Sequence, residues 1–183
     1  MKKVLSNYLF LFSIAGLIIV LDQWTKSIVR SQLQFSQIWV PFDALEPYMR
    51  IVHWRNTGAA FGMFQSFNSI FTILAILVSL AIFYYFPRIS KEETLLRLAL
   101  SLQLGGAIGN LIDRLMLGHV TDFVSILNFT VFNVADFSIS TGVVLLVWVM
   151  WRNEQQTPPE ADENQEIAAE NEVVSSSMPS EDA

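Results

Sequence analysis

The chain has 183 residues, of which 52% are hydrophobic, and a mean hydropathy of +0.43, which excludes an ordinary soluble domain and indicates a membrane protein. The net charge of −6 arises in the C-terminal part, because residues 152–183 carry nine acidic residues and one arginine, whereas residues 1–151 carry ten basic and eight acidic residues. The chain contains no cysteine, which excludes thiol catalysis, thiolate metal sites and disulfides.

The first predicted transmembrane helix covers the apolar run from Val4 to Leu21, which is long enough to cross a bilayer core. Two lysines precede this run, as they also would in a secretory signal peptide. We favour a transmembrane helix because no small-residue cleavage motif follows and further apolar spans come later in the chain. The lysines predict that the helix starts in the cytoplasm.

The polar pair Asp22 and Lys26 is expected to close this first helix. The two residues are four positions apart and therefore lie on one helical face. One interpretation is a self-paired helix end whose charged tips reach toward water. The other is that Asp22 turns into a polar site at the outer membrane boundary. The spacing does not choose between these interpretations.

Residues 31–66 form the first predicted outer segment. Phe35–Val40 and Tyr48–Trp54 are rich in aromatic and β-branched residues and are separated by prolines, which predicts short strands or interfacial pieces. The following motif, Arg-Asn-Thr-Gly-Ala-Ala-Phe-Gly at residues 55–62, contains Asn56, which can both donate and accept hydrogen bonds. Its composition alone favours a glycine-containing turn that leads into a helix.

The second and third predicted spans cover Phe67–Phe86 and Leu95–Leu117, joined by a short basic loop. Gly105 and Gly109 form a small-residue face on the third span, and close helix packing is enough to explain them. Near the outer end of that span, Asn110, Asp113 and Arg114 share one helical face. We expect the guanidinium of Arg114 to pair with a carboxylate.

The second outer connection, Gly118–Asn133, contains Asp122 and a strand-like stretch from Phe123 to Phe132. The fourth span covers Val134–Trp151, and Asn133 and Asp136 lie three residues apart at its start. Asn133 suits an N-cap. The N–H groups of the helix N-terminus favour the anion of Asp136. From residue 152 onward, the polar composition predicts a disordered cytoplasmic tail after a four-helix transmembrane domain at residues 1–151.

Alternating spans place the ends of the first and third helices and the starts of the second and fourth on the same side of the membrane. The polar residues at this outer boundary are Asp22, Asn56, Asn110, Asp113, Arg114, Asp122, Asn133 and Asp136. A close pair of carboxylates in such surroundings shares a proton, because both cannot easily ionise together. Such a pair can activate a water molecule with one carboxylate and protonate the substrate with the other.

Other chemistries fit the sequence less well. A serine–histidine arrangement would need His53 or His119, and neither lies in a nucleophile-elbow motif. A metal site from Asp113, His119, Asp122 and Asp136 would lack any familiar ligand spacing. The strongest rival is a transporter or proton-relay subunit, because carboxylates within membranes also mark ion pathways. It is disfavoured because no carboxylate lies near the middle of a span.

The chain resembles the lipoprotein signal peptidase family (signal peptidase II), the membrane aspartic peptidases of bacteria, over roughly Ile18–Trp148. The motifs that carry the resemblance are Asp-Gln-x-Thr-Lys at 22–26, the motif at 55–62, Gly-Gly-Ala-Ile-Gly-Asn-Leu-Ile-Asp-Arg at 105–114, Val-Thr-Asp-Phe at 120–123 and Phe-Asn-Val-Ala-Asp at 132–136. The resemblance implies that Asp122 and Asp136 are the catalytic pair, a choice over Asp113 that spacing alone does not make. The remaining polar residues at the boundary would shape the pocket and hold the substrate. Phe137 departs from the small hydroxylated residue usual in the family.

The resemblance also implies a fold, a substrate and a location. The fold class would be an all-α membrane protein with four transmembrane helices, a small extracytoplasmic β-cradle and an amphipathic helix. The substrate would be a prolipoprotein whose signal peptide is removed just before a diacylglyceryl-modified cysteine at the membrane. We expect no metal, no cofactor and no nucleic-acid partner, and a monomer. The protein would lie in the bacterial cytoplasmic (inner) membrane with both termini cytoplasmic and its active site at the outer face.

Overall fold

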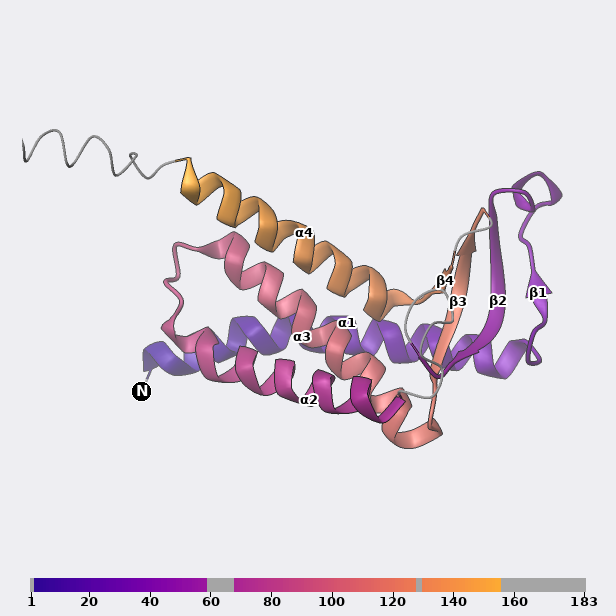
Figure 1. Ribbon diagram of the computed structural model, residues 1–183, viewed down its shortest axis with the longest axis horizontal. Coiled ribbons are helices and arrows are strands. Elements are labelled where there is room, and N and C mark those ends of the chain that lie inside the picture. The colour runs from indigo at the N-terminus through magenta and orange to yellow at the C-terminus, as the bar shows by residue number, and fades with distance from the viewer. Residues whose placement is uncertain (1, 59–67, 128–129, 156–183) are drawn as a thin grey trace, which may run out of the picture. The chain divides into compact units, whose positions relative to one another are not determined.

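The computed structural model describes residues 2–58, 68–127 and 130–155 (Figure 1). The chain divides into two compact units, Met1–Val147 and Trp148–Ala183. In the second unit the described residues continue helix α4, and the rings of Trp148 and Trp151 lie 5.3 Å apart. The predicted acidic tail lies outside the described residues beyond residue 155.

Four helices of the described chain are long and apolar enough to cross a membrane, as predicted. They are α1 (Lys2–Gln32), α2 (Asn68–Tyr85), α3 (Thr94–Leu117) and α4 (Val134–Glu154). Helix α3 is the most enclosed, with half of its apolar window buried, and it packs against α1 and α2. Leu11, Ala15, Ile82, Phe86 and Leu104 form a buried core between α1, the end of α2 and α3.

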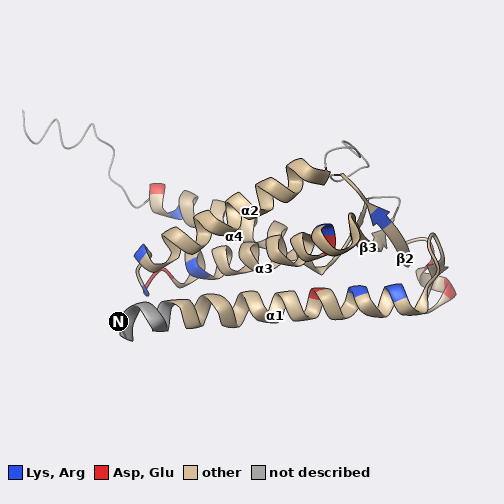
Figure 2. Cartoon of the chain, turned by 90° about the horizontal axis from the view of Figure 1, so that it is seen from below, with Lys and Arg blue, Asp and Glu red and all other residues tan. Residues whose placement is uncertain are grey.

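The predicted end of the first helix at Asp22–Lys26 is wrong, because α1 continues to Gln32. Asp22, Lys26 and Arg30 recur every four residues, so they form one polar stripe along α1. This stripe bonds to groups on α3, so the charged residues need no exit from the helix. In Figure 2 the acidic and basic residues that are coloured on α1 lie in its half nearer the strands.

The strands form one antiparallel sheet in the order β1 (Ile38–Trp39), β2 (Met49–Asn56), β3 (Val120–Ile126) and β4 (Val131–Phe132). Figure 1 shows the sheet at the ends of α1 and α3. Both outer segments therefore contribute strands, as their β-branched and aromatic composition predicted. Within the described part of these segments the only helix is a three-residue 3₁₀ turn at Asp43–Leu45. The described part of these segments contains no longer helix that could be the implied amphipathic helix. Residues 59–67 lie outside the described residues.

Strand β3 changes the expected setting of Asp122. The sequence placed this residue in the second outer connection, just before the strand-like stretch, but it lies within β3, opposite Trp54 of β2. The β-branched residues around it favour a strand that pairs on both edges. Asp122 is therefore held by a backbone ladder rather than by a loop.

Candidate active site

The start of α4 is closed by a reciprocal pair of hydrogen bonds between Asn133 and Asp136. The backbone N–H of Asp136 donates to Oδ1 of Asn133 at 2.9 Å, and the backbone N–H of Asn133 donates to Oδ2 of Asp136 at 3.3 Å. This is a capping box built from an amide and a carboxylate. The predicted N-cap role of Asn133 is confirmed. The box also fixes one oxygen of Asp136, and Asn110 Nδ2 donates to the other at 2.7 Å.

Asp122 is enclosed by two amides. Nδ2 of Asn133 donates to its Oδ1 at 2.6 Å, and Nδ2 of Asn56 donates to its Oδ2 at 2.8 Å. Asn56 reaches Asp122 because the two are diagonal neighbours on paired strands, Asn56 opposite Val120 and Asp122 opposite Trp54. Asn133 therefore bonds to both carboxylates, one through its side chain and one through its backbone.

The pKa of the Asp122 carboxyl is raised to about 7. Burial is the largest cause, since the residue is 1% exposed, and the nearby charge of Asp136 adds to it. The hydrogen bonds from Asn56 and Asn133 act in the opposite direction. A carboxyl group of this kind holds its proton close to neutral pH, as general acid catalysis requires.

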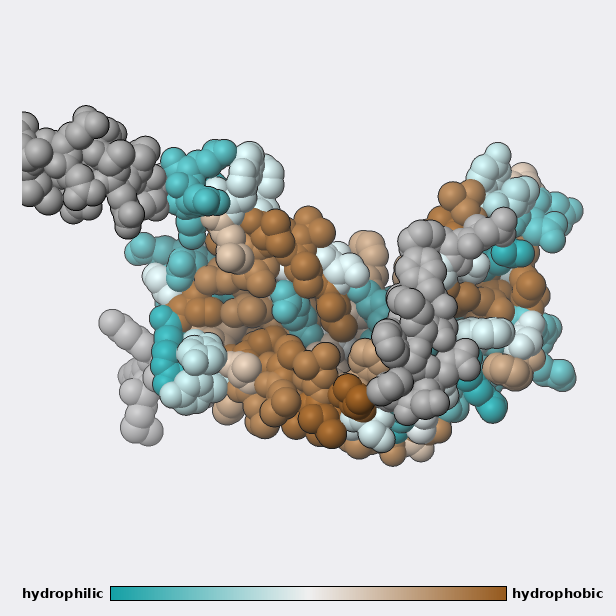
Figure 3. Space-filling view, viewed as in Figure 1, coloured by the Kyte–Doolittle hydropathy of each residue, from teal (hydrophilic) through white to brown (hydrophobic). Residues whose placement is uncertain are grey.

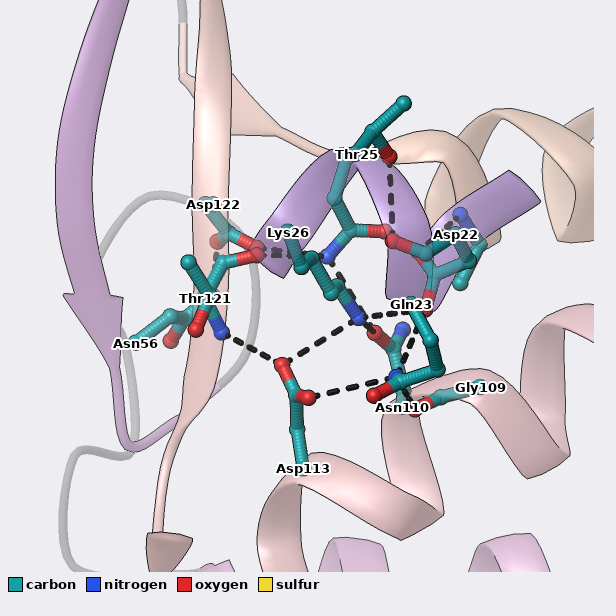
Figure 4. Close-up of polar contacts among 12 residues, drawn as sticks. Asp22, Gln23, Thr25, Lys26, Asn56, Gly109, Asn110, Asp113, Thr121 and Asp122 are labelled. Carbon is teal, nitrogen blue, oxygen red and sulfur yellow. Dashed lines mark hydrogen bonds and ion pairs between the residues drawn. The ribbon is translucent and has the colours of Figure 1, made fainter. Parts of the chain in front are cut away.

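Beside the two carboxylates lies a buried ionic cluster centred on Lys26 (Figure 4). The Lys26 ammonium lies 2.8 Å from Asp22 Oδ2, 3.3 Å from Asp113 Oδ2 and 2.9 Å from Asn110 Oδ1. These three acceptors match the three donors of an ammonium group. Lys26 and Asp22 are both 0% exposed, so the pair does not reach toward water. Of the two interpretations of this pair, the structure supports the polar site.

Asp22 also serves the N-terminus of α4. Its Oδ1 accepts the backbone N–H of Ala135 at 3.0 Å, one of the donors that a helix start leaves unsatisfied. Close packing makes this possible, because a Cβ at Gly109 would lie 2.7 Å from Asp22 Oδ2. The glycines of α3 thus bring α1 and α4 against it and admit the carboxylate between them.

Asp113 ties α3 to the sheet. Its Oδ2 accepts the backbone N–H of Thr121 at 2.9 Å, and Arg30 lies 3.4 Å from its Oδ1. Thr121 directly precedes Asp122, so this bond positions the strand that carries Asp122. The expectation that Arg114 pairs with a carboxylate is wrong for the described residues. Its guanidinium lies 5.6 Å from the ring centroid of Phe71 instead. The cations beside Asp113 come from α1 instead.

A cavity of about 500 Å³ adjoins these groups. Its lining includes Asn56, Asn110, Arg114 and Asp136. Phe137, the residue that departs from the family pattern, also lines it and is 65% exposed. Asp136 therefore faces an open space, whereas Asp122 lies behind Asn56. Part of the 55–62 motif, residues 59–62, lies outside the described residues.

Five residues of this arrangement were not among the predicted site residues: Gln23, Lys26, Arg30, Thr121 and Ala135. Gln23 Nε2 lies within hydrogen-bonding distance of Asp22, Asp113 and the carbonyl of Gly109. The sequence did hold a signal for Lys26. It lies in the same motif as Asp22, and the two form a charged pair at the end of an apolar run. Thr121 gave no such signal, because its backbone N–H makes the contact.

No three His, Cys, Asp or Glu side chains in the described parts of the chain gather closely enough to hold a metal ion. The acidic residues contact amides and cations instead. The chemistry that this site can support is that of a carboxyl pair, in which one member is buried and the other faces a cavity.

Comparison with known proteins decides the family. Residues 14–152 match the sequence model of the family described as Signal peptidase (SPase) II. The chain belongs to the signal peptidase II family. This is a protease family, which confirms the predicted enzyme class. The four apolar helices agree with a multi-pass membrane protein.

Relatives and solved structures agree with this assignment to signal peptidase II. A lipoprotein signal peptidase of Halalkalibacterium halodurans is 37% identical over 153 residues, covering 81% of this chain and 96% of the relative. One from Acinetobacter baumannii is 38% identical over 154 residues, covering 80% and 85%. A bacterial membrane enzyme solved by the in meso method at 2.3 Å has a TM-score of 0.74 and 28% identity, covering 80% of this chain and 90% of that one. The four helices and the small antiparallel sheet of the predicted fold class are confirmed.

Proposed function

We propose that this protein removes the signal peptide from diacylglyceryl-modified prolipoproteins by cleaving the bond just before the lipidated cysteine. The observation that carries the proposal is the pair Asp122 and Asp136, joined through Asn133 beside an open cavity. The family and the names of the relatives support the substrate class. The carboxyl pair supplies a hydrolytic mechanism that needs no further group.

In the proposed mechanism the pair starts with one shared proton. The ionised carboxylate takes a proton from a water molecule as the oxygen attacks the scissile carbonyl carbon, and the protonated carboxyl gives its proton to the carbonyl oxygen. The tetrahedral intermediate then collapses, the C–N bond breaks, and a proton passes to the leaving amine of the cysteine. Asp136 faces the cavity and suits the base, while Asp122, with its raised pKa, suits the acid.

The neighbouring residues have positioning roles in this proposal. Asn110, Asn133 and Asn56 orient the two carboxyl groups through the hydrogen bonds that they donate. Asn56 stands between Asp122 and the cavity, so its amide must release Asp122 when the substrate carbonyl enters. Arg114 lines the cavity and offers donors for substrate carbonyls.

Asp22 and Asp113 act indirectly, through other residues. They hold Lys26 and, through the backbone N–H groups of Ala135 and Thr121, the two segments that carry Asp136 and Asp122. Their role in this proposal is to keep the helix start and the strand at a fixed separation.

A bilayer location follows from the same proposal. A diacylated cysteine keeps its lipid in the membrane, so the scissile bond lies at the interface, where the sheet end of the helices would stand. We propose that this end faces outward from the bacterial cytoplasmic membrane and that both termini are cytoplasmic. We propose that the enzyme works as a monomer, because all the groups named above come from one chain.

The test is cleavage of a synthetic diacylglyceryl-modified prolipoprotein by purified protein in detergent. We expect release of the signal peptide by the wild type and loss of cleavage in Asp122→Asn and Asp136→Asn. Asp43→Asn is the matched control, because Asp43 is an exposed carboxylate in the sheet connection. If the wild type fails on a substrate that another family member cleaves, the proposal is refuted. Proton flux in vesicles then tests the transporter alternative.

A further inference from the structure

A second cavity, of about 260 Å³, adjoins the candidate active site and follows α3 away from the sheet. Both cavities have Asn110, Arg114 and Asp136 in their linings. The rest of the second lining is apolar except for one amide side chain, Gln103. Leu74 of α2 also lines it and is 52% exposed, so the cavity borders the surface that faces lipid.

Gln103 is aligned with the active-site residues of α3. Positions 103, 107, 110 and 114 are spaced as one helical face, and all four line the second cavity. Seven residues separate Gln103 from Asn110, which corresponds to about 10 Å along the helix axis. The amide thus stands two turns deeper in the membrane than the residue that holds Asp136.

Within the described part of the chain, Nε2 of the Gln103 side chain has no hydrogen-bond partner. Its Nε2 is shielded from solvent and unbonded, and no bond of its side chain to a described residue is found. A shielded amide donor without a partner is unfavourable, and hydrocarbon offers it no alternative. By contrast, Ser138, at a similar depth, donates to the carbonyl of Leu102.

Packing holds this amide in place. A Cβ added to Gly142 of α4 would lie 2.7 Å from Cγ of Gln103, so the backbone of α4 presses on the stem of the side chain. Figure 3 shows a hydrophilic patch within a hollow of the otherwise hydrophobic helical surface. The amide of this held stem borders the cavity, and rotation about the Cγ–Cδ bond can turn the shielded Nε2 toward it. An unpaired donor at a lipid-bordered cavity is suited to a ligand that brings its own acceptor.

We propose that Gln103 binds an ester carbonyl of the diacylglyceryl group on the substrate cysteine. This inference rests on the proposed function. The carbonyls of a helical signal peptide already accept hydrogen bonds within their helix, whereas an ester carbonyl has no donor of its own in the bilayer. The covalent path from the scissile carbonyl through the thioether to an ester carbonyl is about eight bonds, or about 10 Å when extended. This length matches the separation of Gln103 from Asn110 along α3.

The test compares two substrates that differ only in the lipid linkage, one with ester-linked and one with ether-linked chains. Their apolar surfaces are nearly equal, but only the ester offers a carbonyl. We expect the wild type to cleave the ester substrate with about tenfold higher kcat/KM, the ratio given by a hydrogen bond worth about 1.4 kcal/mol. We expect Gln103→Met to lower the value for the ester about tenfold and to leave that for the ether unchanged.

Ser79→Ala is the control, because Ser79 is a membrane-embedded polar residue already bonded to the carbonyl of Ala75. It should keep the wild-type preference for the ester. The inference is overturned if Gln103→Met lowers both substrates equally, if it changes neither, or if the wild type shows no preference. Cleavage of neither substrate by the wild type refutes the proposed function itself, so the two failures are distinguishable.

Discussion

Replacing Lys26 by methionine tests whether the buried ionic cluster holds the site together. Methionine keeps most of the volume and removes the charge. The change leaves Asp22, Asp113 and Asn110 without the ammonium that now lies 2.8–3.3 Å from them. Breaking a buried ion pair from one side costs about 3–5 kcal/mol, because the remaining charge is left unpaired. We therefore expect the free energy of unfolding to fall by about 3–5 kcal/mol and activity to be almost completely lost.

The measurement is denaturant unfolding in detergent, followed by helix signal, together with cleavage at a temperature where the variant is folded. Lys91→Met is the matched control, since Lys91 is exposed in the loop between α2 and α3, and it should change neither quantity. The double variant Asp22→Asn with Lys26→Met should lose less than the sum of the two single losses, because the two residues share one interaction. Wild-type stability and activity in Lys26→Met would refute the account of this cluster.

Three further predictions follow from the geometry. The pKa of Asp122, raised to about 7, means that the folded state binds a proton that the unfolded state releases near pH 4. The stability that this group contributes is therefore lost as pH rises toward and through 7. The unfolding midpoint should fall over this range in the wild type but not in Asp122→Asn. Equal slopes of midpoint against pH in the two proteins would contradict the raised pKa of Asp122. Gly109→Ala should lower stability by about 1–3 kcal/mol because its Cβ would meet Asp22 at 2.7 Å, whereas Gly16→Ala, with nothing within 4 Å, should be tolerated; equal unfolding midpoints would argue against the packing described. Cleavage should persist in a chelator, and a loss restored by a divalent ion would count against a mechanism of two carboxyls alone.

The helices were predictable because length and apolar composition alone determine what can cross a bilayer. The outer strands were also predictable from their β-branched and aromatic composition. The end of α1 was not, because the sequence shows Asp22 and Lys26 as charges but does not show that α3 offers them partners. The helix continues because Asp22 and Lys26 pair with each other and α3 adds Asp113 and Asn110 as partners of Lys26.

The gathering of polar residues followed from alternating topology, but their pairing did not. Arg114 was expected to pair with a carboxylate, yet the cations that pair with Asp113 are Lys26 and Arg30 from a distant segment. The placement of Asp122 within β3 depends on the register with β2, which no local pattern specifies. Gln103 could not be singled out either, since only the packed structure shows that its amide is unbonded.

The central claim is that Asp122 and Asp136 act as one catalytic unit, and the cleavage rate of the double variant Asp122→Asn with Asp136→Asn tests it most directly. Residues that act together lose no more in combination than alone. The account predicts that the double variant and each single variant have the same residual rate on the diacylglyceryl-modified substrate. A double variant that is slower than either single variant by the product of their losses, or a single variant that keeps the wild-type rate, would contradict it.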